Sequence, residues 1–275
     1  MDMSRFFMDS QANSQPSSRI SRTLRSGFIA CAAALGLVAT SGIAPVLASE
    51  AGGVPMASAN VDVSNIASLQ RGARNFVNYC QGCHSAKYVR YNQLAKDLGM
   101  TEEQVIKNLM FTAAKPTETM DIAMREADGQ RWFGQAPPDL SLMARAKGAN
   151  YIYNFLRGFY LDSSRPTGAN NLMLPNTSMP DVVWELQGLQ QATFEDVHRN
   201  GTQQEELTGM QLVVPGTLTP EQFDEFARDT VNFLAYIADP VKLDRQRLGI
   251  LVVAFLLVFG LFAYLLKLEI WKDVK

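Results

Sequence analysis

Cys80-Gln81-Gly82-Cys83-His84 is the stretch of this 275-residue chain that says most about its fold. The C-x-x-C-H spacing is the attachment signature of c-type haem. Two thiols three positions apart can each form a thioether with one vinyl group of the same porphyrin. The adjacent imidazole can then bind the iron as an axial ligand. The motif therefore predicts one covalently bound haem c, attached through Cys80 and Cys83 and ligated by His84.

Three other uses of the motif fit the rest of the chain less well. A structural zinc site needs four protein ligands, but beyond residue 48 the sequence offers only Cys80, Cys83, His84 and His198. Adjacent cysteine and histidine residues would also struggle to occupy two tetrahedral corners. A thioredoxin-like redox pair expects a βαβ pattern, which the sequence does not show. A simple disulfide would leave His84 without a role.

The N-terminus has the pattern of an export signal. A basic stretch that ends at Arg25 precedes an uncharged run over residues 26–49, which contains the small-residue cleavage pattern Val46-Leu47-Ala48. A basic region, a short apolar run and such a site together predict that residues 1–48 are a secretory signal peptide. The alternative is an uncleaved membrane helix, which the Ser, Gly and Pro residues within the run disfavour. Because haem c is attached outside the cytoplasm, export agrees with the motif.

A second apolar run predicts a C-terminal membrane anchor. Residues 248–266 are 19 uncharged residues, which as a helix span about 28 Å, close to the hydrocarbon thickness of a bilayer. Basic residues flank both ends, so the orientation rests on the export signal. Residues 241–275 are thus predicted to hold one transmembrane helix and a short cytoplasmic tail. The domain over residues 49–240 is predicted to lie in the periplasm.

Helical patterns dominate between the signal and the anchor. Helix starts are predicted at Asn65, at Thr101 and at Thr219, where capping residues precede apolar positions with a helical period. An aromatic-rich helix is expected over residues 149–159, and residues 50–60 are expected to form a mobile lead-in. No strand pattern of comparable strength is found. The fold class is predicted to be mainly α, a haem domain with long loop insertions and one C-terminal transmembrane helix.

A six-coordinate haem needs a second axial ligand from another part of the chain, and methionine or histidine is the usual choice in electron transfer. Met179 stands out because it lies in the turn-rich segment over residues 174–180, where Pro180 would stiffen a loop over the haem face. Met173 and Met210 remain as alternatives. His198 has the pattern of an exposed helix residue, which is a weaker candidate.

Several segments together resemble the cytochrome c1 family. The resemblance covers residues 64–275 and combines the haem motif with a proline-rich loop, an aromatic helix, a capped helix and a single C-terminal span. Few other haem proteins combine these features with the stretch Ala136-Pro137-Pro138-Asp139-Leu140-Ser141.

The resemblance implies roles for particular residues. The methionine before a proline in the second loop of that family is the axial ligand, which points to Met179. A carbonyl of Pro137 or Pro138 would accept the hydrogen bond of the axial histidine ring. An arginine upstream of the Pro-Pro pair would lie near a haem propionate, and the spacing leaves Arg125 and Arg131 as equal candidates.

The resemblance also implies a function. Such a subunit accepts an electron from a Rieske iron–sulfur protein and passes it to a soluble or membrane-anchored cytochrome c. It does so beside cytochrome b in the quinol–cytochrome c reductase of a respiratory or photosynthetic chain, in the bacterial inner membrane. The chain alone would not be catalytic, since it would be the electron-transfer subunit of a proton-translocating oxidoreductase.

Other haem proteins compete with this interpretation. A gas-binding cytochrome would need a vacant sixth position. A peroxidase of the two-haem type would need a second C-x-x-C-H, which the sequence lacks. An anchored haem subunit of a terminal oxidase is a closer alternative. Nucleic-acid binding is not indicated, because charged residues make up only 19% of the chain and its formal net charge is −2.

Overall fold

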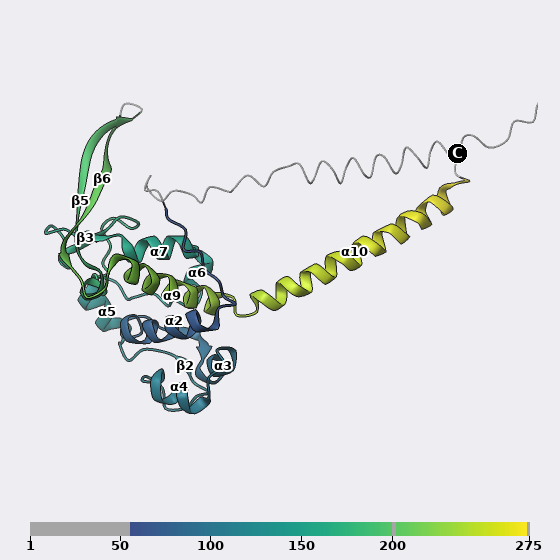
Figure 1. Cartoon of the computed structure of the whole chain (residues 1–275), viewed down its shortest axis with the longest axis horizontal. Coiled ribbons are helices and arrows are strands. Elements are labelled where there is room, and N and C mark those ends of the chain that lie inside the picture. The colour runs from purple at the N-terminus through teal and green to yellow at the C-terminus, as the bar shows by residue number, and fades with distance from the viewer. Residues whose placement is uncertain (1–55, 200–201, 274–275) are drawn as a thin grey trace, which may run out of the picture. The chain divides into compact units, whose positions relative to one another are not determined.

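A computed structural model describes residues 56–199 and 202–273 (Figure 1). The predicted signal peptide, residues 1–48, lies outside the described residues. The described part is mainly helical with a small share of strand, so the predicted fold class is confirmed. The helices are α2 (Ile66–Tyr79), α3 (Tyr91–Asp97), α4 (Glu102–Asn108), α5 (Glu126–Phe133), α6 (Met143–Ala146), α7 (Ala149–Arg157), α8 (Trp184–Gln187), α9 (Pro220–Ala238) and α10 (Lys242–Trp271). The strands are β1 (Ala86–Arg90), β2 (Thr119–Met120), β3 (Phe159–Leu161), β4 (Ala169–Asn171), β5 (Gly188–Arg199) and β6 (Thr202–Pro215).

The three predicted helix starts are confirmed by their caps. The Asn65 side chain accepts a hydrogen bond from the backbone of the first turn of α2. Thr101 and Thr219 each form a capping box, in which the Thr hydroxyl accepts from the third helical N–H and the Gln side chain accepts from the Thr N–H. The aromatic helix α7 ends at Arg157, two residues earlier than predicted, because Gly158 follows it and Phe159 already pairs in β3.

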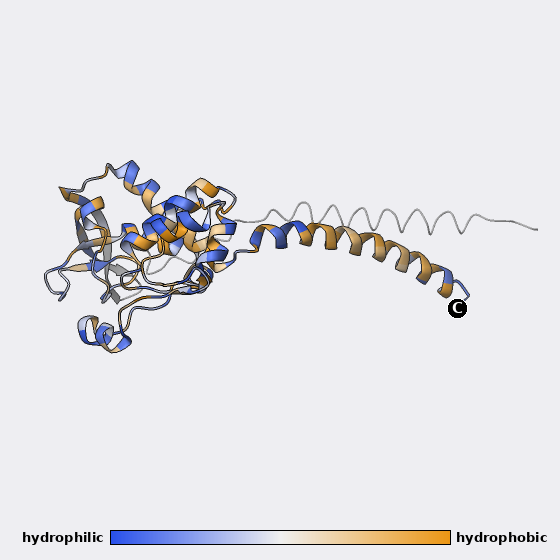
Figure 2. Ribbon diagram, turned by 90° about the horizontal axis from the view of Figure 1, so that it is seen from below, coloured by the Kyte–Doolittle hydropathy of each residue, from blue (hydrophilic) through white to orange (hydrophobic). Residues whose placement is uncertain are grey.

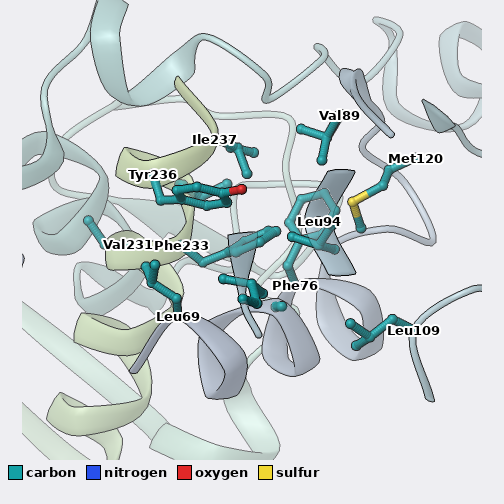
Figure 3. Packing of buried hydrophobic residues seen from close by; sticks show 14 of the residues in the cluster. Leu69, Phe76, Val89, Leu94, Leu109, Met120, Val231, Phe233, Tyr236 and Ile237 are labelled. Carbon is teal, nitrogen blue, oxygen red and sulfur yellow. The ribbon is translucent and has the colours of Figure 1, made fainter. Parts of the chain in front are cut away.

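The core is built on α2 and α9, which lie side by side (Figure 1). Their backbones approach closely at Gly72, where an added Cβ would lie 2.1 Å from the carbonyl oxygen of Asp229. Next to this contact, the rings of Phe76 and Phe233 pack with their centroids 5.6 Å apart. Figure 3 shows how apolar side chains of both helices meet those of β1, α3 and β2 in one cluster. The close contact holds α2, and hence the haem motif at its end, against α9.

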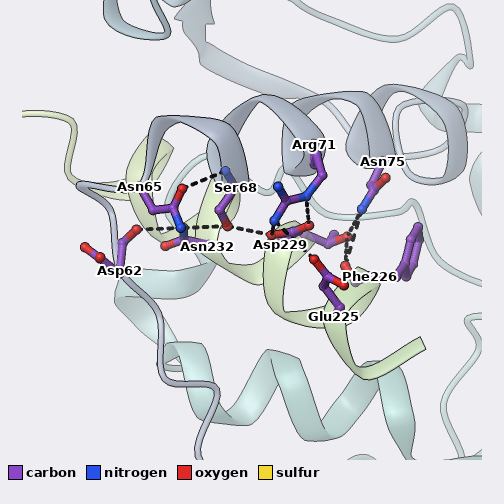
Figure 4. Close-up of polar contacts among 10 residues, drawn as sticks. Asp62, Asn65, Ser68, Arg71, Asn75, Glu225, Phe226, Asp229 and Asn232 are labelled. Carbon is purple, nitrogen blue, oxygen red and sulfur yellow. Dashed lines mark hydrogen bonds and ion pairs between the residues drawn. The ribbon is translucent and has the colours of Figure 1, made fainter. Parts of the chain in front are cut away.

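A buried polar network fixes the same two helices in register (Figure 4). Asp229 on α9 is 5% exposed, and its carboxylate accepts hydrogen bonds from the Ser68 hydroxyl at 2.6 Å and from Arg71 Nη2 at 2.9 Å. Asn232, one turn further on, donates to the Ser68 hydroxyl at 3.0 Å and to the Asp62 carbonyl at 2.8 Å. A buried carboxylate is costly unless it is paired in this way, so a shift of either helix along the other is disfavoured.

The segment before α2 is bound to the body from residue 57 onward. Ala57 exchanges two hydrogen bonds with the Asn154 side chain of α7, at 3.0 and 2.7 Å. Ala59 is fully buried, and its carbonyl accepts from Arg228 of α9 at 2.9 Å. For its described part, the prediction of a mobile lead-in over residues 50–60 is therefore wrong. The side chains that bind it come from helices distant in the sequence.

A long hairpin of β5 and β6 lies in a part of the chain where the sequence shows no strand pattern as strong as its helical patterns. The two strands pair antiparallel over their whole length, and two shorter antiparallel pairs join β1 to β2 and β3 to β4. The ring of Phe194 packs on Tyr160 of β3 with centroids 5.6 Å apart. Much of β5 is exposed, so polar residues occupy both faces and hide the alternating pattern of a half-buried strand. The dipeptide Asn-Gly at positions 200 and 201 is a sequence signal that favours a hairpin between the segments before and after it.

His198 is correspondingly a residue of β5, not of a helix, and it pairs with Gln203 of β6. The predicted helical setting of this histidine is wrong, because the strand pairing of the hairpin overrides the weak local helix pattern around it.

Helix α10 fits the predicted anchor. It runs for 30 residues and none of them is buried against the rest of the described chain. It is hydrophobic over most of its length and hydrophilic near both ends (Figure 2). Of the helices described, it alone is long and apolar enough to cross a membrane. The helix begins at Lys242, before the predicted span of residues 248–266, since the polar residues that precede the span continue the helix. One of them, Arg245, forms an ion pair with the Asp239 carboxylate.

Candidate haem site

The end of α2 folds the haem motif into a compact turn. The N–H groups of Cys80 and Gln81 both donate to the Phe76 carbonyl at 2.9 Å, which terminates the helix. The N–H groups of Cys83 and His84 then donate to the Cys80 carbonyl at 3.0 and 2.8 Å. One turn of backbone therefore brings both thiols and the imidazole to the same end of α2.

Gln81, inside the motif, fastens this turn to the body. Its side chain is 2% exposed, and its amide nitrogen lies 2.8 Å from the Tyr91 hydroxyl, 3.0 Å from the Thr112 hydroxyl and 3.3 Å from the Asp121 carbonyl. Sequence reasoning missed this role, since the motif leaves this position free and the partners come from later segments. The turn is therefore fixed both by the helix that precedes it and by hydrogen bonds from Gln81, a residue of the motif, to later segments of the chain.

The imidazole of His84 is oriented by the Pro-Pro segment. Its Nδ1 lies 2.7 Å from the Pro138 carbonyl oxygen. A carbonyl can only accept, so Nδ1 carries the proton and Nε2 keeps a lone pair for an iron. Burial lowers the pKa of His84, although the hydrogen bond to Pro138 and the charge of Asp139 oppose the shift. The ring is therefore neutral at physiological pH, as an axial ligand must be.

Asp139 ties the Pro-Pro segment to the chain that follows the motif. Its carboxylate accepts from the Ser85 hydroxyl at 2.8 Å and from the N–H groups of Lys87 and Ser141, each at 2.9 Å. Burial alone would raise the pKa of this carboxyl, but the hydrogen bonds from Ser141, Lys87 and Ser85 outweigh it and hold the pKa below its usual value. Sequence reasoning quoted Asp139 without assigning it a role. An aspartate that accepts from the N–H two residues on is a recognised turn device.

One pocket that is open to solvent joins the predicted ligands. His84 and Met179 both line it, together with Cys83 of the motif. Most of its remaining wall is aromatic or proline, which suits the apolar body of a porphyrin. The other lining residues are Tyr79, Phe133, Gln135, Pro137, Pro138, Ser178, Pro180 and Val182.

The competing methionines lie elsewhere. Met173 is 5% exposed and lines a different pocket, between α7, α9 and the β5–β6 hairpin, and Met210 of β6 lines that same pocket. His84 does not border it. The structure thus brings Met179, and neither alternative, into the pocket of His84.

The chemistry of the donor set fits a c-type haem. Burial raises the pKa of Cys80 to about 12, with the neighbouring Cys83 as a lesser cause, and burial also raises the pKa of Cys83. Both sulfurs are thus uncharged, and a thioether to a porphyrin keeps them uncharged. The neutral sulfur of Cys83, an imidazole and a thioether line one largely apolar pocket, and Cys80 lies on the same backbone turn as Cys83 and His84.

The two predicted propionate arginines are both engaged with Asp128. Arg125 Nε lies 2.7 Å and Arg131 Nη2 lies 2.9 Å from its carboxylate oxygens. Neither arginine lines the pocket of His84. Arg125 does line an adjacent pocket whose wall shares Pro137 and Pro138 with the first.

This chain matches one family model and several known proteins over most of its length. The model of the Cytochrome C1 family matches residues 58–274. The chain is 46% identical to cytochrome c1 of Allochromatium vinosum over 228 residues, which cover 83% of this chain and 93% of that protein. It is 40% identical over 235 residues to a Nitrosomonas europaea protein named ammonia monooxygenase gamma subunit, covering 84% and 94% of the two chains. It is 32% identical to cytochrome c1 of Rhodospirillum rubrum, covering 75% and 82%.

The family match runs from the segment before α2 to the end of the anchor, and so includes the haem motif, the Pro-Pro segment and the Met179 loop. With that extent, and with relatives aligned over most of both lengths, the chain belongs to the cytochrome c1 family, whose members are membrane-anchored subunits that carry electrons on a c-type haem.

Proposed function

We propose that this chain takes single electrons from a Rieske iron–sulfur protein and passes them to a soluble or membrane-anchored cytochrome c. It would do so beside cytochrome b in a quinol–cytochrome c reductase. The observation that carries the proposal is the shared pocket of His84, Met179 and Cys83. Membership of the cytochrome c1 family supports the same assignment.

The residues of the pocket suit electron transfer better than binding of a gas or substrate. When bound, the haem supplies a one-electron redox centre. His84 and Met179 would occupy both axial positions and leave none open, which disfavours a gas-binding role. A thioether ligand in a buried site raises the reduction potential. The hydrogen bond from His84 to Pro138 fixes the ring, so little would move between oxidation states.

The membrane arrangement is part of the proposal. Residues 1–48 would be removed as a signal peptide, residues 49–240 would form the periplasmic haem domain, and residues 241–275 would hold the anchor with the C-terminus in the cytoplasm. Of the two arginines, Arg125 is the better candidate for a haem propionate, because its pocket shares the Pro-Pro wall.

Covalent attachment is tested by mass spectrometry of the chain purified from membranes. We expect one haem added and residues 1–48 absent, with the haem retained in acidic acetone. Cys80→Ser should leave a single thioether, since Cys83 alone remains to react. Loss of the haem from the unaltered chain into acidic acetone would contradict covalent attachment.

The partners are tested by affinity purification of the tagged full chain from gently solubilised membranes. We expect cytochrome b and the Rieske protein to co-purify, with quinol–cytochrome c reductase activity. A matched control is a chain stopped at Asp239, which keeps α9 and both axial ligands but lacks α10. It should keep its haem spectrum yet leave the membrane fraction and lose the partners, because no other described helix can span a bilayer.

Other co-purifying subunits would redirect the assignment. Recovery of terminal-oxidase subunits would favour the oxidase alternative. The name of the Nitrosomonas europaea relative also makes recovery of monooxygenase subunits a result to look for. Either outcome, without cytochrome b, would contradict the proposed function.

A further inference from the structure

The loop that delivers Met179 contains a backbone conformation that needs support. Leu174 to Thr177 form a tight turn, closed by a hydrogen bond from the Thr177 N–H to the Leu174 carbonyl at 3.1 Å. Within it Asn176 adopts the left-handed conformation, with φ of 65°. This region is costly for residues other than glycine, although asparagine tolerates it best. Asn176 lies three residues before Met179, so the shape of the turn influences where the sulfur lies.

Arg165, on a neighbouring loop, holds this turn through two hydrogen bonds to Asn176, which together form the Arg165 clamp. Its Nη1 donates to the side-chain oxygen of Asn176 at 3.2 Å, and its Nη2 donates to the Asn176 carbonyl at 3.1 Å. Its Nε is buried and has no hydrogen-bond partner among the described residues. A buried donor without a partner costs about 1–3 kcal/mol. The guanidinium group therefore occupies this position because of the two bonds to Asn176, in spite of the desolvated Nε.

A second residue of the β3–β4 hairpin, Asn170, also bonds to Asn176. The Asn176 N–H donates to the side-chain oxygen of Asn170 at 2.8 Å, and the Asn170 amide donates to the Asp162 carboxylate at 2.9 Å. Asp162 also begins the turn that carries Arg165, whose N–H donates to the Asp162 carbonyl at 3.1 Å. The N–H, carbonyl and side chain of Asn176 are thus all held by one small hairpin.

The turn is connected to Met179 through Thr177. Thr177 is 4% exposed, and its hydroxyl accepts a hydrogen bond from the Met179 N–H at 3.3 Å. A shift of Asn176 would move the Met179 backbone with it.

We propose that Arg165 is a positioning residue for the axial methionine, and that its clamp on Asn176 keeps the Met179 sulfur on the iron. This inference rests on the proposed function, in which Met179 is the sixth ligand. It assigns to Arg165 an effect on the occupancy of that ligand beyond any effect on overall stability. Its donors are amides and a guanidinium, and hydrogen bonds from Ser164 and Asn170 lower the pKa of the Asp162 carboxylate, so the clamp does not depend on pH near neutrality.

The test is the rate at which carbon monoxide binds the reduced, full-length haem protein in detergent. Carbon monoxide can reach the iron only while the methionine is away, so at saturating gas the rate reports methionine dissociation. We expect Arg165→Gln to raise this rate at least tenfold. Arg165→Lys, which can replace one of the two bonds, should fall between. Asn176→Gly keeps the left-handed backbone but loses one acceptor, and should raise the rate by a smaller factor.

A double variant and a matched control separate positioning from general loosening. Asn176→Gly adds little to Arg165→Gln if the two residues act together, because contacting residues are non-additive. Arg228→Gln removes another arginine with two backbone carbonyl partners, on Ser58 and Ala59. It should lower the unfolding temperature while leaving the carbon monoxide rate within twofold of the unaltered chain.

The outcomes distinguish the role of Arg165 from the ligation of the iron by Met179. If the Arg165→Gln rate stays within twofold while Met179→Leu binds carbon monoxide rapidly, the clamp is overturned and the ligation stands. An equal rise in Arg228→Gln would also overturn it. Rapid binding by the unaltered chain, as fast as by Met179→Leu, would remove the proposed ligation and the clamp together.

Discussion

Met179→Leu is expected to convert the haem from six-coordinate to five-coordinate. Leucine is close to methionine in volume, so the loop should keep its packing, but it has no sulfur to bind the iron. The reduction potential should fall by on the order of 0.1 V or more, since axial ligands set haem potentials over a wide range. The reduced protein should bind carbon monoxide, and the long-wavelength band of methionine-ligated ferric haem should disappear. Potentiometric titration and visible spectra measure all three.

Met173→Leu is the matched control for this prediction. Met173 is a buried methionine of the same loop region, six residues earlier, yet it lines the pocket between α7, α9 and the hairpin. Its replacement should leave the potential, the band and the resistance to carbon monoxide unchanged. If Met179→Leu keeps the band while Met173→Leu or Met210→Leu loses it, the axial ligand has been assigned to the wrong residue.

Gly72→Ala is expected to destabilise the protein by about 3 kcal/mol or more, because a methyl group cannot fit between α2 and α9. Its Cβ would lie 2.1 Å from the Asp229 carbonyl oxygen and 2.7 Å from the Phe233 Cβ. Neither neighbour is the movable end of a side chain, so the helices must separate. An exposed helix position would show the opposite sign, since alanine favours helix over glycine by about 1 kcal/mol. Denaturant unfolding of the full chain in detergent measures the loss.

The consequence should extend to the haem, because α2 ends at the attachment motif. Separation of α2 from α9 strains the bonds from Arg71 and Ser68 to Asp229, and we expect a smaller fraction of the exported chain to carry haem. Gly209→Ala in β6 is the control, since no atom lies within 4 Å of its added Cβ. It should change the unfolding free energy by less than about 0.5 kcal/mol. Equal stability of Gly72→Ala and the unaltered chain would contradict the close helix contact.

Features specified by neighbouring residues were predictable from the sequence. The caps at Asn65, Thr101 and Thr219 are interactions within one helical turn, and all three were confirmed. The membrane helix was predictable for a similar reason, since a long uncharged run has one low-energy environment whatever surrounds it. The haem motif belongs to the same group, because its two thiols and its imidazole are brought together by a single turn of backbone.

Features that need partners from elsewhere in the chain were predicted poorly or only by resemblance. The β5–β6 hairpin was missed because its strands are stabilised by each other and not by an alternating core face. The prediction of a mobile lead-in is wrong for residues 57–59 because their ordering comes from Asn154 and Arg228, which no local pattern connects to them. The choice of Met179 over Met173 and Met210 remained open on pattern alone.

By itself, the sequence determined the local parts of this protein: where three of its helices begin, where the haem-attachment motif lies and which segment can cross a membrane. Each of these depends on residues within one or two turns of one another. Only the tertiary structure decided which methionine shares a pocket with His84, which carbonyl orients its ring and which arginine holds the Met179 loop. Those pairings join segments far apart in the chain, and they follow from the packing of α2 on α9 and of the loops around it.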